Sequence, residues 1–279
     1  MFFTARRTLH ATMLVALTFA LAACGGPPQT TVTMTGPEPE VVARYAAVED
    51  NGTLIPAVNP GYLIGQNART RVAYAGSERP GTVVVDPHAR VLYYVDEGGT
   101  AMRYGIAVGR EGRGFRGSAV ISVKREWPRW TPTRNMIRTD PEVYGPYAAG
   151  LPGGIENPLG ARALYLYRNG RDTYYRIHGT NNPSTIGRAT SAGCIRLFNQ
   201  DILDLYERVE PGSPVKVRTL EESLAMEGEM VENEHGLMVP LSSYPPEVQA
   251  EIRAGNIPWP KFTAMLGVAA DEDTDAGGV

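Results

Sequence analysis

A histidine and a cysteine stand at a spacing and in surroundings suited to nucleophilic catalysis. His178 lies in Ile-His-Gly-Thr-Asn, and Cys194 follows 16 residues later in Ser-Ala-Gly-Cys-Ile-Arg. An imidazole beside a thiol takes up the thiol proton and converts the sulfur into a thiolate nucleophile. We therefore interpret Cys194 as a nucleophile and His178 as its general base.

The residues before the thiol support this interpretation. Gly193 has no side chain, so its backbone can approach a bound carbonyl closely. The backbone amides of Ala192, Gly193 and Cys194 are expected to form an oxyanion hole. The alternative is an inert buried cysteine beside an unrelated histidine. The glycine context, and the fact that only His178 of the four histidines lies near the thiol in sequence, favour catalysis.

The second cysteine, Cys24, has a different predicted role. Arg6 and Arg7 precede an apolar run and the tetrapeptide Leu-Ala-Ala-Cys, which is typical of a lipoprotein signal whose cleavage makes Cys24 the lipidated N-terminus. Ordinary secretion, with Cys24 in the discarded peptide, is the alternative. Both remove the protein from the cytoplasm and leave Cys194 without a disulfide partner. Gly25 after the cysteine favours the outer membrane.

Composition divides the chain into four segments. They are a signal peptide (1–23), a tether rich in proline, glycine, threonine and asparagine (24–80), a globular domain (81–218) and an acidic, partly disordered extension (219–279). The globular domain holds 19 Lys/Arg, 17 of them Arg, against 13 Asp/Glu, whereas the extension holds 2 against 12. Arginine binds carboxylates through paired hydrogen bonds, so peptide carboxylates are the expected partners. The alternative, expected for most of these arginines, is a solvated surface. Export excludes nucleic acid, and the opposite charges allow the extension to dock on the domain.

Strand patterns dominate the globular domain. Asn169-Gly170 is a strong signal for a tight hairpin turn, which places His178 at the end of its second strand. A helical pattern runs from Asn199, the expected N-cap, to Val209. The segments with strand character are 82–85, 91–95, 101–108, 118–124, 162–167, 173–178 and 215–217. The pattern predicts a mainly β domain with a helix after the nucleophile loop.

A long segment between Trp127 and Gly160 is dense in proline, glycine and aromatic residues. A loop of this length inside a compact domain is typical of a functional lid. The alternative is a structural excursion that covers the sheet.

No cofactor and no metal are expected. The histidines and cysteines do not supply a compact set of three or four metal ligands. Gly112-x-Gly114-x-x-Gly117 matches the dinucleotide-binding pattern literally, but strand-like residues follow where that motif requires a helix.

The run His178-Gly-Thr-Asn, Ile186-Gly187 and Ser191-x-Gly-Cys-Ile-Arg196, with the helix that follows, resembles the L,D-transpeptidase catalytic domain of the YkuD type. The resemblance covers about residues 81–218. It implies a mainly β, sandwich-like fold with the catalytic cysteine in a loop before a helix. Ala192 departs from several relatives, which carry a second histidine at this position, and so removes a possible proton relay.

The resemblance also implies roles for individual residues. Cys194 would attack the carbonyl between the L-centre of diaminopimelate and D-Ala in a peptidoglycan stem peptide, and His178 would move the proton. The backbone carbonyl of Gly179 would orient the imidazole. The implied substrate-binding residues are Arg196, Thr180, Asn181 and Ser191.

The resulting hypothesis is a periplasmic, lipid-anchored L,D-transpeptidase of the outer membrane. It would pass the acyl group of a Cys194 thioester to an amine, either on a second stem peptide or on a lysine of an outer-membrane protein. One alternative is hydrolysis of the same linkage by an L,D-carboxypeptidase or amidase. Another is a catalytically idle wall-binding lipoprotein. The sequence leaves the acceptor open.

Overall fold

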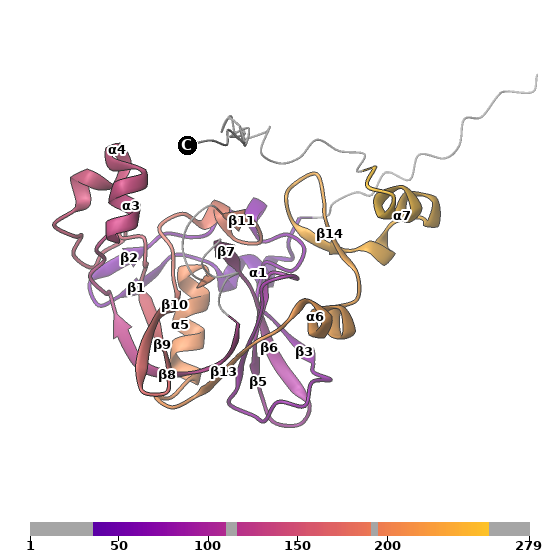
Figure 1. Ribbon diagram of the computed structural model, residues 1–279, viewed down its shortest axis with the longest axis horizontal. Helices are drawn as coiled ribbons and strands as arrows, with labels where there is room; N and C mark the ends of the chain where they lie inside the picture. The colour runs from indigo at the N-terminus through magenta and orange to yellow at the C-terminus, as the bar shows by residue number, and fades with distance from the viewer. Residues whose placement is uncertain (1–35, 110–115, 191–194, 257–279) are drawn as a thin grey trace, which may run out of the picture. The chain divides into compact units, whose positions relative to one another are not determined.

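A computed structural model describes residues 36–109, 116–190 and 195–256 (Figure 1). The helices are α1 (Pro39–Arg44), α3 (Arg134–Thr139), α4 (Pro141–Tyr144), α5 (Asn199–Arg208), α6 (Leu220–Glu227) and α7 (Pro246–Arg253), with 3-10 helices η1 (Pro60–Tyr62), η2 (Gly145–Tyr147), η3 (Pro183–Thr185) and η4 (Leu241–Ser243). None of the helices in these ranges is long and apolar enough to cross a membrane.

The strands are β1 (Val48–Asp50), β2 (Thr53–Ile55), β3 (Thr70–Ala73), β4 (Val83–Asp86), β5 (Val91–Val95), β6 (Thr100–Gly105), β7 (Ala107–Gly109), β8 (Gly117–Glu126), β9 (Arg162–Arg168), β10 (Arg171–His178), β11 (Ala189–Thr190), β12 (Ile195–Arg196), β13 (Pro214–Val217), β14 (Met230–Glu232) and β15 (Met238–Pro240). Two strand pairs, β1 with β2 and β14 with β15, stand outside the main sheet.

Eleven of the described strands form one mixed sheet in the order β11-β7-β12-β10-β9-β8-β13-β4-β5-β6-β3. The strands β6 and β7 lie near opposite ends of this order, yet only Ile106 separates them in the chain. The sheet must therefore curl until its two ends come together. The predicted mainly β fold is confirmed, and its layers are halves of one continuous sheet.

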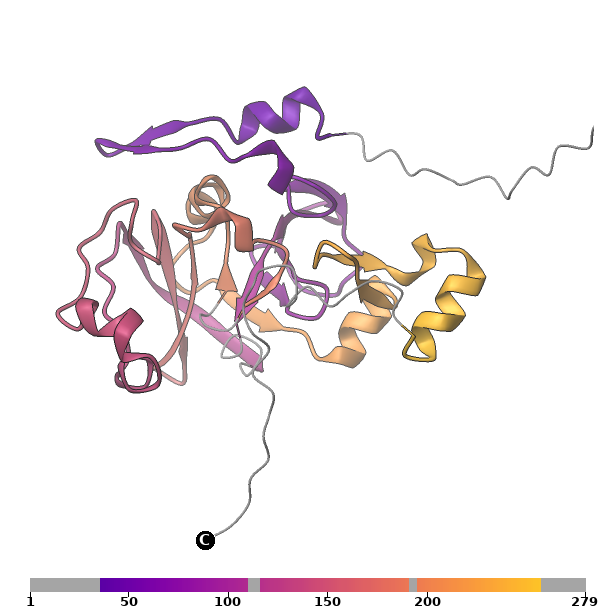
Figure 2. The ribbon, with the colours of Figure 1, turned by 90° about the horizontal axis from the view of Figure 1, so that it is seen from above.

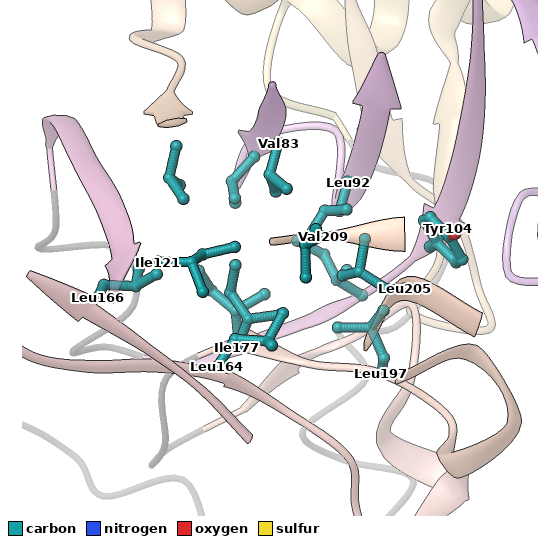
Figure 3. Packing of buried hydrophobic residues seen from close by; sticks show 14 of the residues in the cluster. Val83, Leu92, Tyr104, Ile121, Leu164, Leu166, Ile177, Leu197, Leu205 and Val209 are labelled. Carbon is teal, nitrogen blue, oxygen red and sulfur yellow. The ribbon is translucent and has the colours of Figure 1, made fainter. Parts of the chain in front are cut away.

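Apolar side chains from both halves of the sheet meet in one core (Figure 3). Val83 and Leu92 come from one half, and Leu164 and Ile177 come from the other; all four are inaccessible to solvent. Leu205 of α5 packs into the same cluster. Removal of this apolar surface from water is the main force that keeps the sheet folded over α5.

The turn and strand predictions are confirmed with one exception: the strand expected over 101–108 is divided at Ile106 into β6 and β7, because the chain changes here from one end of the sheet to the other. Asn169 (φ 51°) and Gly170 (φ 73°) both adopt the left-handed conformation that a two-residue hairpin requires, and β9 and β10 pair on either side of them. Strand β8 begins at Gly117, so a strand and not a helix follows the glycine-rich pattern.

Residues 36–80, predicted to belong to a tether, pack against the domain instead, and this prediction was wrong. Tyr45 is fully buried, meets Phe198 edge to face at 5.5 Å and donates its hydroxyl proton to Asp201 at 3.1 Å. Arg69 forms an ion pair with Asp201 at 2.9 Å. Figure 2 shows this indigo segment alongside α5. The buried apolar residues that precede β3 are irregularly spaced, so they leave no periodic pattern in the sequence: Tyr45, Ile55, Val58, Leu63 and Ala68.

The acidic extension also docks, through α6, β14 and β15. Glu222 pairs with Lys216 at 2.8 Å, and Glu227 pairs with Arg218 at 2.5 Å. Helix α7 ends shortly before Gly255, which has φ 87°. Opposite charge therefore contributes to attachment of the described part of the extension.

A pair of substitutions distinguishes a packed segment from a tether. Tyr45→Ala should lower the free energy of unfolding by about 3–5 kcal/mol, because it removes a buried aromatic ring. Leu54→Ala, at a side chain 61% exposed in the same segment, should change it by less than about 0.5 kcal/mol. Chemical denaturation measures both values. Equally small effects would contradict the packing.

Candidate active site

His178 lies at the end of β10 with only 4% of its surface exposed. Its Nδ1 is 2.7 Å from the carbonyl oxygen of Gly179. Because a carbonyl can only accept, the proton of the neutral ring must be on Nδ1, and Nε2 carries the lone pair. This is the contact that the family resemblance implied for Gly179. It leaves Nε2 able to accept a proton from a thiol.

The surroundings of His178 keep the imidazole neutral. Burial is the largest cause that lowers its pKa, to about 3, and the positive charge of Arg196 is the next. Arg176 adds a smaller effect in the same direction, whereas the hydrogen bond to Gly179 opposes the shift. At neutral pH the ring is therefore a base without a charge.

The side-chain amide of Asn199 holds the backbone around His178. Its Oδ1 accepts hydrogen bonds from the N–H groups of Ala161 (3.0 Å) and Thr180 (3.2 Å), and its Nδ2 donates to the Thr180 carbonyl (2.9 Å). A Cβ atom on Gly160 or Gly179 would lie 2.2 Å from the same Oδ1. One amide thus ties α5 to the chain before β9 and to the chain after β10.

The sequence assigned Asn199 the wrong role. Phe198 occupies the N-cap position of α5, and Asn199 is the first helical residue. The N-cap prediction considers only hydrogen bonds within the helix itself. The partners of Asn199 lie 19 and 38 residues away, and no local pattern could have identified them.

Thr180 and Asn181, both predicted to bind substrate, differ in their surroundings. Thr180 is buried, and its hydroxyl accepts a hydrogen bond from the N–H of Asn182 at 3.0 Å. Asn181 is exposed and donates to the carbonyl of Glu156 at 3.0 Å. Thr180 therefore supports the local turn, and Asn181 connects it to the long segment before β9. Their contact with substrate stays a prediction.

Cys194, Ser191, Ala192 and Gly193 lie outside the described residues, as does Cys24. The strands on either side of the nucleophile segment are described. Both β11 and β12 pair with β7, and Ala189 and Ile195 share the register partner Val108. Strand β12 also lies parallel to β10.

Register along β10 relates the nucleophile segment to the histidine. Ile195 lies beside Ile177, and Arg196 lies beside His178. The residue bonded to Cys194 is therefore on the strand next to the one that carries the base. Arg196, another predicted substrate-binding residue, is placed where its charge acts on His178.

The segment from Trp127 to Gly160 folds on itself. The ring of Trp130 lies 6.4 Å from that of Tyr144 and 6.2 Å from that of Tyr147. The amide of buried Asn157 donates to the carbonyls of Pro128 (3.0 Å) and Pro152 (2.9 Å), which closes the base of the segment. It is a folded excursion with its own contacts.

A groove of about 470 Å³ lies between this excursion and strands β9 and β10. Arg176 of β10, whose charge helps to keep His178 neutral, stacks on Tyr165 with its guanidinium carbon 4.0 Å from the ring centroid. The groove therefore lies along the strand that carries the base. Its walls include Arg129, Trp130, Met136, Tyr165, Tyr174 and Arg176.

Tyr174 is a candidate binding residue that the sequence did not reveal. It has φ 63°, which is strained for an aromatic residue, and it is 81% exposed. The side chain of Asp172 accepts from its N–H at 2.8 Å, and that of Thr173 accepts from the N–H of Tyr175 at 3.2 Å. The surroundings thus hold an exposed aromatic ring at the groove at an energetic cost, as is common at functional sites.

Comparison with known proteins agrees with this geometry. The family model of the L,D-transpeptidase catalytic domain matches residues 80–217. The chain is 38% identical over 141 residues to the Escherichia coli protein named Probable L,D-transpeptidase ErfK/SrfK. This alignment covers 50% of this chain and 44% of that protein. It is 35% identical over 139 residues to a Fuscovulum blasticum protein whose name places it among the L,D-transpeptidases, 48% of this chain and 68% of that protein.

The match thus spans less than half the length of the E. coli relative and about two thirds of the F. blasticum relative. A solved Brucella melitensis structure, described as a Probable carnitine operon oxidoreductase, is 51% identical and covers 57% of this chain and 98% of its own. Its name differs from those of the other relatives and describes that protein alone. The TM-score of this comparison is 0.40.

The hydrogen bonds from the Asn199 side chain to the backbone of Ala161 and Thr180, here called the backbone clamp, can be tested by substitution. Asn199→Ala should lower the free energy of unfolding by at least about 2 kcal/mol, because it leaves buried backbone groups of Ala161 and Thr180 without partners. Asn181→Ala, which removes one exposed hydrogen bond, should cost less than about 0.5 kcal/mol. Urea denaturation compares the two. A neutral Asn199→Ala would show that the clamp is dispensable.

The neutral state of His178 predicts a specific titration. Its ring resonances should not titrate between pH 7 and pH 5, because its pKa is about 3. Arg196→Gln should raise that pKa, although burial remains. In the unfolded chain this histidine takes up a proton near pH 6.5, whereas in the folded protein it stays neutral down to about pH 3. Its titration should therefore lower the free energy of unfolding as the pH falls from about 6.5 towards 3. NMR titration of the labelled histidine rings checks this, and a midpoint near 6.5 in the native protein would contradict it.

Proposed function

Since the chain belongs to the L,D-transpeptidase family, we propose that it forms a thioester between Cys194 and a peptidoglycan stem peptide and transfers the acyl group to an amine. The single observation that carries the proposal is the state of His178. The ring is buried and neutral, and its contact with the Gly179 carbonyl fixes the tautomer that carries its proton on Nδ1. It lies beside β12, the strand that follows Cys194.

In the proposed first step, the sulfur of Cys194 attacks the carbonyl carbon of the bond to the terminal D-Ala. Nε2 of His178 takes the thiol proton, and the backbone amides of Ala192, Gly193 and Cys194 stabilise the oxyanion. The carbon–nitrogen bond then breaks, the imidazolium returns the proton to the leaving amine, and the thioester remains. In the second step an acceptor amine attacks the thioester and gives a proton to Nε2 of His178; the carbon–sulfur bond then breaks and the imidazolium returns this proton to the sulfur.

The low pKa of His178 supports concerted proton transfer. With a pKa of about 3, the ring of His178 would not retain a proton taken from a thiol, because an ordinary thiol has a pKa near 8.5. Negative charge that develops on sulfur and oxygen during the attack would raise the histidine pKa. We therefore propose that the resting enzyme holds a neutral cysteine and a neutral histidine.

The groove beside β10 is the proposed site for the stem peptide. Arginine side chains complement the carboxylates of such a peptide, and Tyr174 and Trp130 offer apolar surfaces to its alkyl groups. Arg196, Thr180, Asn181 and Ser191 are proposed to orient the peptide at the thiol. The excursion from Trp127 to Gly160 is then a lid, and its movement belongs to the proposal.

The cellular setting is also part of the proposal. A signal over residues 1–23 and lipidation of Cys24 would anchor the enzyme to the periplasmic face of the outer membrane, next to the wall. Residues 81–218 are proposed as the catalytic domain. The acceptor is either a second stem peptide or a lysine of an outer-membrane protein.

Hydrolysis is the second candidate, with water in place of the amine. A wall-binding protein without catalysis is the third candidate, and it would not require a histidine held in one tautomer.

Purified protein and tetrapeptide muropeptides decide among these candidates. Cross-linked dimers are expected for a transferase, and trimmed monomers would indicate hydrolysis. Mass spectrometry should find one carbapenem adduct on the wild type and none on Cys194→Ala. His178→Ala should slow adduct formation by at least about 100-fold, whereas His88→Ala, at an exposed position, should not. Wild-type protein that forms no carbapenem adduct and converts no muropeptide would contradict the proposal.

A further inference from the structure

The turn at Ile186 and Gly187, which leads into β11, is held from two directions. Asn67, from the segment before the family match, donates from its amide to the carbonyl of Ile186 at 3.2 Å and to that of Tyr62 at 3.0 Å. Arg90 donates to the carbonyl of Gly187 at 3.1 Å. The carbonyls of two successive residues are therefore both bound by side chains from elsewhere in the chain.

The contact with Asn67 is close-packed. Gly187 has φ 83°, and a Cβ atom there would lie 2.1 Å from the Asn67 Oδ1. On another side, a Cβ atom on Gly105 would lie 2.5 Å from the Asn67 Cα. Asn67 is 3% exposed and fits between two glycines. This packing leaves the turn little freedom to shift.

Arg90 connects the turn to the acidic extension. Its buried guanidinium donates to the carbonyl of Gly236 at 2.7 Å and forms an ion pair with Glu232. The same group therefore binds the turn and two residues of the extension. A planar guanidinium can make these bonds together, and an ammonium on a flexible stem cannot reproduce the geometry.

The held turn lies close to the nucleophile in sequence and in register. Ala189, two residues after Gly187, pairs with Val108, and Ile195, directly after Cys194, pairs with the same residue. The N–H of Gly187 donates to the carbonyl of Ile106 at 3.2 Å, where the sheet closes. A shift of the turn would therefore move the strand that leads to the thiol.

We propose that Asn67 and Arg90 are positioning residues for acyl transfer, and that residues 36–80 and 219–256 belong to the catalytic unit. This inference rests on the proposed thioester chemistry of Cys194. The two residues hold Ile186 and Gly187 so that the nucleophile segment starts from one position. Neither Asn67 nor the partners of Arg90 in the extension lie within the family match of residues 80–217.

The test compares acylation by a carbapenem at saturating and limiting concentration. Arg90→Lys and Glu232→Gln should lower the limiting acylation rate by about 10-fold or more, because a small displacement of a reacting group is costly. The apparent dissociation constant of the carbapenem should change by less than about twofold, because neither residue lines the groove under the lid. Asn67→Ala should behave as Arg90→Lys does.

Glu229→Gln is the matched control. Glu229 pairs with Arg253 at 2.6 Å within the same extension, but both side chains are exposed and neither binds the turn at Gly187. This variant should react at the wild-type rate. All rates are measured at 25 °C on samples whose circular dichroism shows a folded chain, and if Arg90→Lys does not fold, Glu232→Gln decides.

The outcomes separate the two proposals. A wild type that forms no adduct refutes the thioester chemistry. A reactive wild type with folded Asn67, Arg90 and Glu232 variants that react equally fast overturns the positioning role alone. A slower limiting rate with unchanged carbapenem affinity supports it, whereas an equal loss in the Glu229→Gln control would also overturn it.

Discussion

The hydrogen bond from Nδ1 of His178 to the carbonyl of Gly179 is the interaction on which the site depends. A buried imidazole needs a partner, and the next carbonyl along the chain can serve only if the backbone bends back towards the ring. Asn199 holds that bend through hydrogen bonds to the backbone N–H and the backbone carbonyl of Thr180. Since Asn199 begins α5, the tautomer of the histidine depends on how that helix packs in the core.

The closure of the sheet explains why distant segments meet near this histidine. The chain passes from β6 to β7 through Ile106 and so joins the two ends of the sheet. The flanking segments dock on the domain through ion pairs, with Arg69 bound to buried Asp201 and Glu227 bound to buried Arg218. Loss of one partner from such a pair leaves an uncompensated buried charge. The flanks are therefore integral to the folded unit.

Local signals predicted much of the β architecture. The Asn169-Gly170 turn, the strands beside it and the helix after the nucleophile segment follow from side-chain chemistry within a few residues. The packing of residues 36–80 was not predictable in this way. Tyr45 and its partner Asp201 are 156 residues apart, and single well-spaced contacts produce no periodicity.

The amino-acid sequence was enough to identify the reactive groups, a thiol and an imidazole 16 residues apart in glycine-rich surroundings, and the patterns that form strands. The protonation state of that imidazole depends on the folded chain. Its pKa depends on burial and on the charges of Arg196 and Arg176. The role of Asn199 was also decided there, because its partners come from other elements. Burial, charge proximity and long-range hydrogen bonds arise only when the chain has folded, which is why composition and spacing could not show them.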